Sequence, residues 1–410
     1  MKRPISPDPQ PGSSPATETT KKACLQPATN SPKEGSPASV PIVGADEACA
    51  RKLNITCTYP QPVSVEDDDT YDLDPTGDIV IVLGDEDRLL PSDLAELTPE
   101  WLSNAKNRRD PDPTGDEEYR EYQIRCSSKH LMLASKTFER QLPYFMDEIE
   151  KHGFVEIGLF DEPPRIFLLV LMIIHGRTRL LPRKIGLSTL AGVAELSHKL
   201  ECEEAVNASA QLWISKFGKD LPRVYSKYAR WWLQISWVFQ GKYVFQKITK
   251  VIQATSTDAI EGNLLCVPDT IIDELNEARY RCIEHLISAL QGLLKDLATG
   301  DNNSQWCTPT DPDSKHLCLS SVLGDLTTHM YSEGLLIPEP KRPYPGIGFG
   351  PLMERFVAKA EDSSYSCHGS EEPECRLLAR ITRLFKDIQQ PLGLDINSSQ
   401  LAGLEEDAEQ

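Results

Sequence analysis

The apolar segment between Pro163 and Gly176 constrains the fold of this chain more than any other. The segment is PPRIFLLVLMIIHG, and its middle is apolar on every side of a helix, so other elements have to cover all of its faces. Two prolines at its start and a glycine after its end are typical helix boundaries. Its apolar run, Ile166–Ile174, is too short to cross a bilayer, which takes about 20 residues. We therefore predict a helix at the centre of a folded domain.

Elements that can cover this helix precede and follow it in a mixed order. Ile79–Leu83 is a largely β-branched apolar run between glycines, which predicts a strand covered on both faces. Alternating polar and apolar residues predict two further strands, at Tyr122–Cys126 and Val155–Leu159. Helical periodicity recurs at 187–200 and 206–217. This order predicts an α+β module, a small mixed sheet flanked by a helical bundle.

The segment between the second and third strands predicts one amphipathic helix. Its apolar stripe consists of Leu131, Ala134, Phe138 and Leu142. Ser127 or Ser128 can cap this helix, because a serine oxygen accepts hydrogen bonds from first-turn amides. The predicted core of the module includes Ile79, Ile81, Leu131, Phe138, Leu142, Leu171, Leu190 and Trp213.

Three segments of this module match a known family. They are GDIVIVLG, SSKHLMLASKTFERQL, and IIHGRTRLLP followed by LSTLAGVAELSHKLEC. Through them the chain from Gly77 to Phe217 resembles a BTB/POZ domain, particularly those of fungal BTB-domain proteins. Ser135 and Phe138 stand where the family's Ser and Phe recur, whereas Ser127 replaces a histidine that many animal members carry. The resemblance implies a protein-interaction module and not an enzyme, with no catalytic residue, cofactor or metal.

The same resemblance suggests a partner-binding segment. Family members that recruit the cullin-type ubiquitin ligase scaffold carry a hydrophobic-x-Glu motif after this helix, and the matching residues are Phe145, Met146 and Asp147, with Asp for Glu. A cullin scaffold is therefore one candidate partner, and a second copy of the chain, forming a homodimer, is another. In the alternative interpretation Phe145 closes the core and Asp147 is merely exposed.

Composition divides the chain into four parts. Residues 1–75 are rich in Pro, Ser, Thr and Ala and predict a disordered tail, because they cannot bury enough apolar surface to offset the ordering entropy. Residues 76–220 form the BTB/POZ-like module, with an insertion at 85–121. Residues 221–392 predict an all-α C-terminal domain, and 393–410 an acidic flexible tail.

The C-terminal domain is expected to pack as a helical core. Its aromatic stretch at 225–245 resembles base-stacking surfaces, but its few cations favour burial instead. Residues 267–299 predict one long helix with a wide apolar stripe. A last helix, CRLLARITRLFKDI, places its arginines, Arg380 among them, opposite its apolar side, and we expect it to dock on its own domain and not on a membrane.

Other patterns argue against a nucleic-acid interface, membrane binding and a zinc site. The formal net charge of −19 argues against a direct nucleic-acid interface. No apolar leader follows Met1, so we expect an intracellular protein of the cytoplasm or nucleus that does not bind membranes. The candidate zinc ligands by residue type are Cys307, Cys318, Cys367, His368 and Cys375. They include no Cys-x-x-Cys pair, which favours scattered thiols.

The glycine cluster YPGIGFG at 344–350 lacks the Lys-Ser/Thr pair of a phosphate-binding loop, so we predict a turn.

The sequence favours a protein-interaction adaptor or scaffold. A transcription-associated regulator recruited through partners and an enzyme built on the C-terminal helices are the alternatives.

Overall fold

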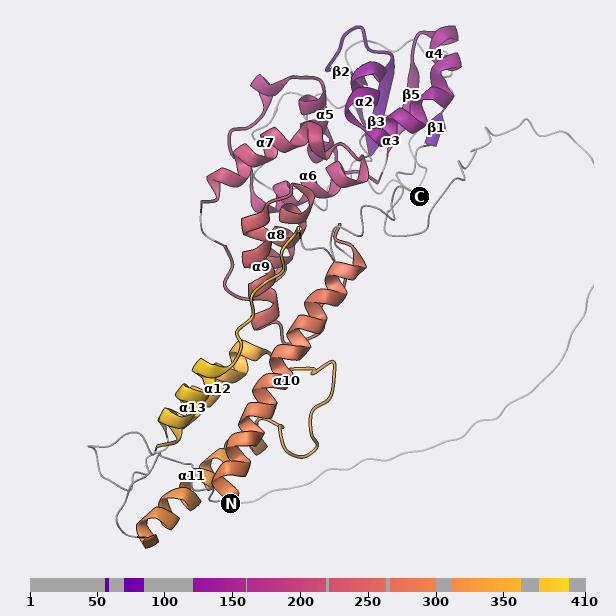
Figure 1. The fold of residues 1–410 in the computed structure, drawn as a ribbon. Coiled ribbons are helices and arrows are strands. Elements are labelled where there is room, and N and C mark those ends of the chain that lie inside the picture. The colour runs from indigo at the N-terminus through magenta and orange to yellow at the C-terminus, as the bar shows by residue number, and fades with distance from the viewer. Residues whose placement is uncertain are drawn as a thin grey trace, which may run out of the picture. The chain divides into compact units, whose positions relative to one another are not determined.

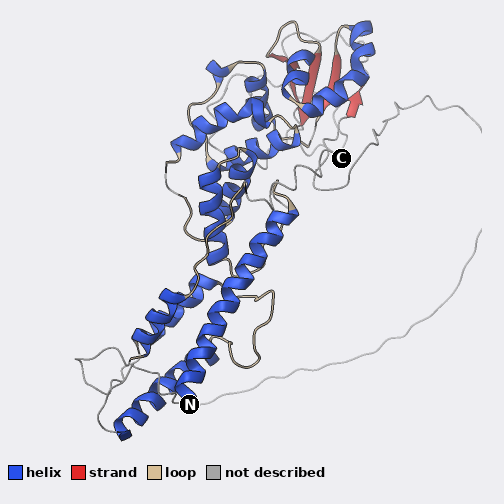
Figure 2. Ribbon diagram, viewed as in Figure 1, coloured by secondary structure: helices blue, strands red, loops and turns tan. Residues whose placement is uncertain are grey.

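The computed structural model describes eight stretches of the chain. They are residues 56–58, 70–84, 121–159, 161–218, 221–262, 266–299, 312–362 and 376–397. Within them the structure is a mixed α+β fold, as predicted, with a small sheet and many helices (Figure 2). Most of the expected tail at 1–75, nearly all of the insertion at 85–121 and the end of the acidic tail lie outside the described residues.

The sheet has five strands in the order β1-β5-β3-β4-β2. The strands are β1 (Thr56–Thr58), β2 (Thr70–Asp72), β3 (Ile79–Gly84), β4 (Glu121–Cys126) and β5 (Val155–Gly158). The central strand β3 is antiparallel to β4 and parallel to β5, and Ile81 aligns with Ile124 on one side and Ile157 on the other. Every residue of β3 is buried, as its apolar run predicted.

Two of these strands correct the sequence analysis. β1 and β2 fall inside the range 1–75, which was predicted to be a disordered tail. β2 gains backbone partners by pairing in parallel with β4, Leu73 is buried directly after it, and Asp72 forms an ion pair with Arg125 at 3.2 Å. A strand of three residues is too short to show an alternating pattern, so composition alone missed both.

The module's helices lie next to this sheet and to one side of it (Figure 1). They are α2 (Ser128–Ala134), α3 (Lys136–Gln141), η4 (Leu142–Phe145), α4 (Met146–His152), α5 (Pro164–Ile174), η5 (Thr178–Leu180), α6 (Leu187–Lys199) and α7 (Glu203–Lys216). α5 packs against α2, α6 and α7, and nearly all of its residues are buried. The eight candidate core residues, from Ile79 to Trp213, are all buried.

The sequence predicted a single helix for the stripe from Leu131 to Leu142. The structure instead divides this stripe between two helices, α2 and α3, and the 3-10 helix η4. The break occurs at Ser135, whose backbone is extended at φ −133° and ψ 118°. Its hydroxyl donates to the carbonyl of Leu200 at 2.5 Å and accepts from the amide of Phe138 at 3.1 Å. These two bonds satisfy a buried serine outside a helix and start α3, which the apolar periodicity could not reveal.

The predicted cap of α2 was also wrong. Ser127 occupies the N-cap position but makes no side-chain cap bond. Instead the carboxylate of Asp78, just before β3, accepts from the amide and the hydroxyl of Ser128, at 2.7 and 2.6 Å. The first turn of α2 is thus capped from a residue 50 positions earlier, which ties the helix to the sheet.

The remaining helices belong to two hydrophobic cores. They are α8 (Lys227–Val238), α9 (Lys242–Thr255), α10 (Asp269–Thr299), α11 (Pro312–Ser332), α12 (Phe349–Glu361) and α13 (Leu377–Asp387). The first core contains residues of β3, β4 and β5, of α2 to α9 and of the start of α10 up to Leu275, together with Leu394 and Ile396. The second core begins at Ile283 on α10 and includes α11, α12 and α13. The cores therefore divide inside α10, whereas composition placed a boundary at 220/221.

Arg279 lies on α10 between the two cores and is fully buried. Its guanidinium donates to the carbonyls of Ser256, Thr257, Pro343, Tyr344 and Ile347 at 2.7 to 3.0 Å. Burial lowers the pKa of Arg279, although the group remains a cation. The glycine cluster at 344–350 forms the turn that encloses this guanidinium, where Gly346 has φ +74°. Arg279 thus holds the segments after α9 and before α12 against α10.

The predicted basic face of the last helix is only partly exposed. Arg380 on α13 is 3% exposed, because α13 packs against both α11 and α12. The prediction that this helix docks on its own domain is confirmed by that packing.

Candidate partner-binding site

The predicted partner-binding residues lie where η4 passes into α4. Phe145 ends η4, and Met146 and Asp147 form the first turn of α4. η4 packs against α3, and α4 packs against η4 and β5, so the segment is held at one end of the sheet (Figure 1). Pro143 at the start of η4 fixes the turn, and Gly153 ends α4 at φ +85°.

The three residues do not share one environment. Phe145 is half-buried and packs against the first core, whereas Met146 is 39% exposed and Asp147 is exposed. Phe145 therefore contributes to the stability of the fold, as the alternative interpretation proposed. Asp147 lies in the first turn of α4, where a carboxylate also stabilises the helix by interacting with its dipole.

The sequence analysis missed the most exposed aromatic side chain of this segment. Tyr144 is 70% exposed and directly precedes Phe145. Leu133, at the end of α2, is 89% exposed, so apolar side chains of this module face solvent at more than one position. A Pro-Tyr pair beside the recognised motif was the available signal, since proline fixes the turn that leaves the next ring outside.

The surface of α4 carries its own ion pairs. Glu148 accepts from Lys151 at 2.9 Å and lies 3.5 Å from His152. The hydrogen bond from Lys151 lowers the pKa of Glu148. These pairs lie at the surface and contribute little to stability. Neither pair involves the exposed carboxylate of Asp147.

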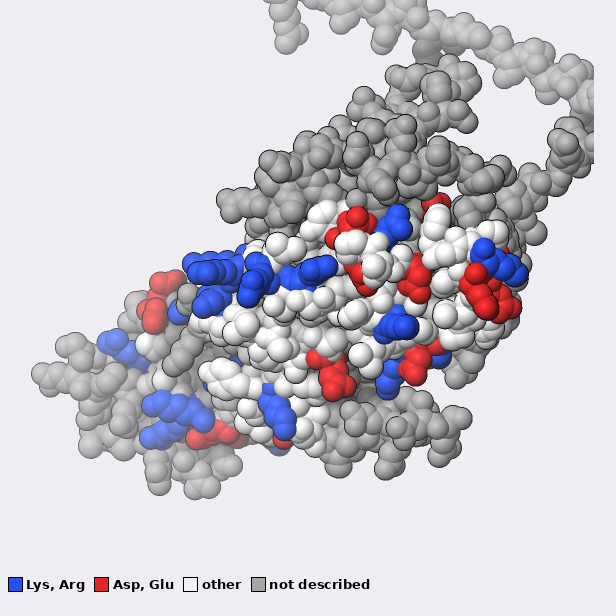
Figure 3. Space-filling model, turned by 90° about the horizontal axis from the view of Figure 1, so that it is seen from above, with Lys and Arg blue, Asp and Glu red and all other residues white. Residues whose placement is uncertain are grey.

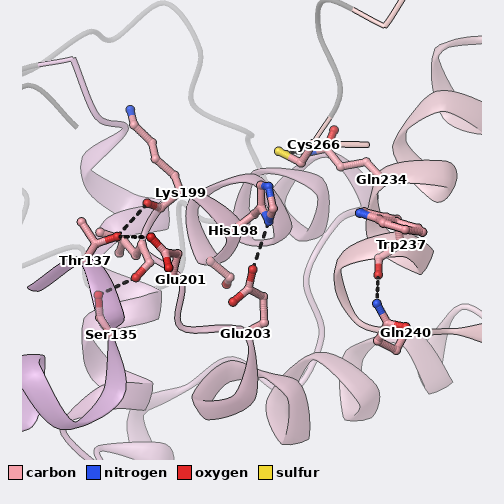
Figure 4. Close-up of polar contacts among 12 residues, drawn as sticks. Ser135, Thr137, His198, Lys199, Glu201, Glu203, Gln234, Trp237, Gln240 and Cys266 are labelled. Atoms are coloured by element: carbon pink, nitrogen blue, oxygen red, sulfur yellow. Dashed lines mark hydrogen bonds and ion pairs between the residues drawn. The ribbon is translucent and has the colours of Figure 1, made fainter. Parts of the chain in front are cut away.

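A polar junction fixes α3, which in turn supports η4 (Figure 4). At its start, Ser135 bonds the carbonyl of Leu200, and Thr137 donates to the carbonyl of Lys199 and to Glu201, both at 3.3 Å. Arg140 forms an ion pair with Glu201, and this pair lowers the pKa of Glu201. The α6–α7 connection thus reaches α3 through four side-chain contacts.

Two more contacts complete that connection. Lys199 pairs with Glu162. His198 lies 3.0 Å from Glu203 (Figure 4). The backbone or side chains of His198, Lys199 and Leu200 thus contact the start of α3, the segment before α5, and α7.

His175 is a partly buried histidine of the module, and its two ring nitrogens have distinct partners. Nδ1 lies 2.9 Å from the carbonyl of Leu171, and Nε2 accepts from the amide of Ser127 at 3.0 Å. The ring therefore carries its proton on Nδ1 and is neutral. Burial lowers the pKa of His175, and this outweighs the raising effect of its Leu171 bond. The residue joins the end of α5 to the start of α2, and both of its ring nitrogens are engaged in these contacts.

The described residues offer no obvious site for a metal. Within them, no group of three or more His, Cys, Asp or Glu residues is arranged to hold an ion. Of the five candidate ligands named above, only Cys318 lies in the described part of the chain. Burial raises the pKa of the Cys126 thiol, and raises that of Cys202 to about 12, so neither is a ready nucleophile.

Charge on the described surface is uneven. On the face shown in Figure 3, basic side chains gather in a group apart from most of the acidic ones. The net charge of −19 therefore does not exclude local basic surfaces. None of the helices in the described stretches combines the length and apolar character needed to cross a membrane.

The fold was compared with known proteins at three levels. Protein-family models, curated proteins and solved structures each gave no match. The assignment of a family therefore depends on the residues of this chain and on their arrangement.

Proposed function

We propose that this protein is an adaptor or scaffold whose first core is a BTB/POZ-type module. The proposal is supported by the order of elements, β3, β4, α2, α3, β5, α5, α6 and α7, in which the motif residues fill connected positions. Ser135 and Phe138, the residues that carry the resemblance, start α3 and fill the core beneath it.

The observation that carries the proposal is the exposed surface at the η4–α4 turn. Tyr144 and Met146 present apolar area to solvent beside the exposed carboxylate of Asp147, on a rigid support made by α3 and β5. Interfaces concentrate their binding energy in a few aromatic and apolar side chains near their centre. The turn has that composition, and a partner that covers it would bury both side chains.

A cullin-type ligase scaffold is the candidate partner for this surface. Asp147 is one methylene shorter than the family's Glu, so we expect weak affinity. Asp147→Glu should strengthen binding, and Tyr144→Ala should weaken it by about 2 kcal/mol if the ring is a central contact. Phe145→Ala should abolish binding but also lower stability, because that ring packs on the core.

The experiment is calorimetric titration of the cullin N-terminal region into the full chain. Wild type is compared with Asp147→Glu, Tyr144→Ala and, as a matched control for the added methylene, Asp273→Glu on the exposed side of α10. Thermal melts of every variant separate binding from folding. Absence of binding by wild type and by Asp147→Glu would reject the ligase adaptor and leave only the general interaction role.

A further inference from the structure

A pocket of about 320 Å³ lies between α9 and the segment that precedes α8. Leu221, Val251 and Ala254 give it an apolar lining. Arg223, Lys247 and Lys250 also line it, and all three are exposed. The pocket thus combines an apolar interior with three cations, on a chain whose net charge is −19.

The wall of this pocket is preformed. The hydroxyl of Thr255, near the end of α9, accepts from the amide of Tyr225 at 2.7 Å and donates to the carbonyl of Val251 at 2.7 Å. Leu221 packs against the first core. The segment from 221 to 225 is therefore held at both ends, by the core at Leu221 and by α9 at Tyr225, so a ligand would not have to order it.

The three cations have no local counterion. Within the stretches that the structure describes, no carboxylate forms an ion pair with Arg223, Lys247 or Lys250, and no acidic residue lines the pocket. The ammonium group of Lys247 lies 5.6 Å from the ring centre of Tyr243, which is 63% exposed at the pocket rim. This arrangement favours an anionic ligand that also has an apolar part.

α9 already binds an extended segment of its own chain on the adjacent face. The amide of Leu394 donates to Thr249 at 2.8 Å, and that of Gly393 donates to Gln253 at 3.1 Å. Leu394 and Ile396 are buried, while Asp395 between them is exposed. The helix thus holds an extended peptide by apolar anchors with a carboxylate left at the surface.

We propose that the pocket binds an acidic linear peptide supplied by a partner protein. One aliphatic side chain enters between Leu221, Val251 and Ala254. Carboxylates on either side of it pair with Arg223, Lys247 and Lys250. This site is separate from the η4–α4 turn, so it does not depend on the function proposed above.

A peptide fits these observations better than a nucleic acid does. A polynucleotide places phosphates along its whole length, and the net charge of −19 opposes their approach outside the basic surface. A short acidic peptide brings few charges and supplies the aliphatic group that the lining accommodates. The extended segment at 393–396 shows that the same helix already holds a peptide through apolar anchors and backbone amides.

Fluorescence anisotropy with a labelled peptide GDELEDG and the full chain tests this proposal. The amide-matched peptide GNQLQNG keeps the leucine and removes the carboxylates. The triple variant Arg223→Gln, Lys247→Gln, Lys250→Gln removes the cations. Its matched control, Lys129→Gln, Lys136→Gln, Lys295→Gln, removes three exposed lysines elsewhere on the described surface.

We expect GDELEDG to bind wild type and the control variant equally within twofold. The triple variant and the amide peptide should each bind about 3- to 125-fold more weakly, because each of the three exposed charge pairs contributes about 1.4- to 5-fold. Equal binding of both peptides, or of the triple variant and wild type, would overturn the proposal. So would displacement of GDELEDG by a thymidine decamer at lower concentration than by unlabelled peptide, since the site would then prefer a nucleic acid.

Discussion

The two cores of this protein differ in how they are built and in what they present to solvent. The first core combines a five-stranded sheet with helices, and its members range along the chain from Leu73 to Ile396. The second core is made of helices alone and takes its residues from Ile283 to Ile388. α10 contributes to both, and Arg279 lies between the two contributions. The two cores are therefore joined by a continuous helix and by one buried cation.

The difference shows where polar groups do the most to define the fold. In the first core, Ser135, His175 and Asp78 each connect elements that are far apart in the chain. At the junction between the cores, Arg279 donates to five carbonyls from two loops. Apolar packing stabilises both cores, while these few polar groups fix which elements meet.

The largest expected effect comes from emptying either core. Phe138→Ala in the first core and Phe356→Ala in the second should each cost about 3–5 kcal/mol, because both rings are fully buried and leave a cavity. Since α10 and Arg279 couple the cores, both variants should show one cooperative transition at lower temperature. Scanning calorimetry provides the measurement. Two separate transitions in wild type would contradict the coupling.

Arg279→Met should cost about 3 kcal/mol, because five carbonyls lose the donor that Arg279 provides, and those of Ser256 and Tyr344 belong to buried residues. Arg281→Met, two residues along the same helix and exposed, is the control and should be nearly neutral. Urea unfolding followed by far-UV circular dichroism measures both. A broadened or biphasic transition in Arg279→Met alone would sharpen the account, and equal stability of the two variants would refute it.

Ser135→Ala should cost about 1–2 kcal/mol, since it removes the cap of α3 and leaves the carbonyl of Leu200 without that donor. The control is Ser127→Ala, whose hydroxyl makes no cap bond and whose loss should change stability by less than about 0.5 kcal/mol. Chemical denaturation of the pair distinguishes the two serines. If Ser127→Ala proved the costlier change, the capping described for α2 would be wrong.

His175 should give the smallest effect, and one that depends on pH. Its pKa in the folded protein is lowered, so its contribution to stability is present above the unfolded value of about 6.5 and is lost as pH falls through the folded pKa. Its titratable and charged neighbours include His130, Asp74 and Arg177. The stability difference between wild type and His175→Gln should therefore shrink from pH 7.5 to pH 5. A difference that grows on acidification would show that the ring is charged when folded.

Much of the fold could be predicted from the sequence because it depends on periodicity. β3, α5 and α10 can be recognised in the sequence from uninterrupted or regularly spaced apolar residues. The break at Ser135 and the burial of Arg279 could not be predicted, because each depends on carbonyls brought in from distant segments. The same limit applies to the candidate site. The motif at 145–147 was visible, but the exposure of Tyr144 and the half-burial of Phe145 follow from packing on the first core.

The most direct test of the account asks whether the first core carries the partner surface. Tagged full-length wild type, the double variant Tyr144→Ala, Met146→Ala, and Tyr331→Ala are used for quantitative pull-down from a cell extract. Tyr331 on α11 is 65% exposed, close to the 70% of Tyr144, so it is a matched ring on the second core's helices. We predict that the double variant loses partners that wild type and Tyr331→Ala retain equally. Loss of the same partners from Tyr331→Ala, with the double variant unchanged, would contradict the account.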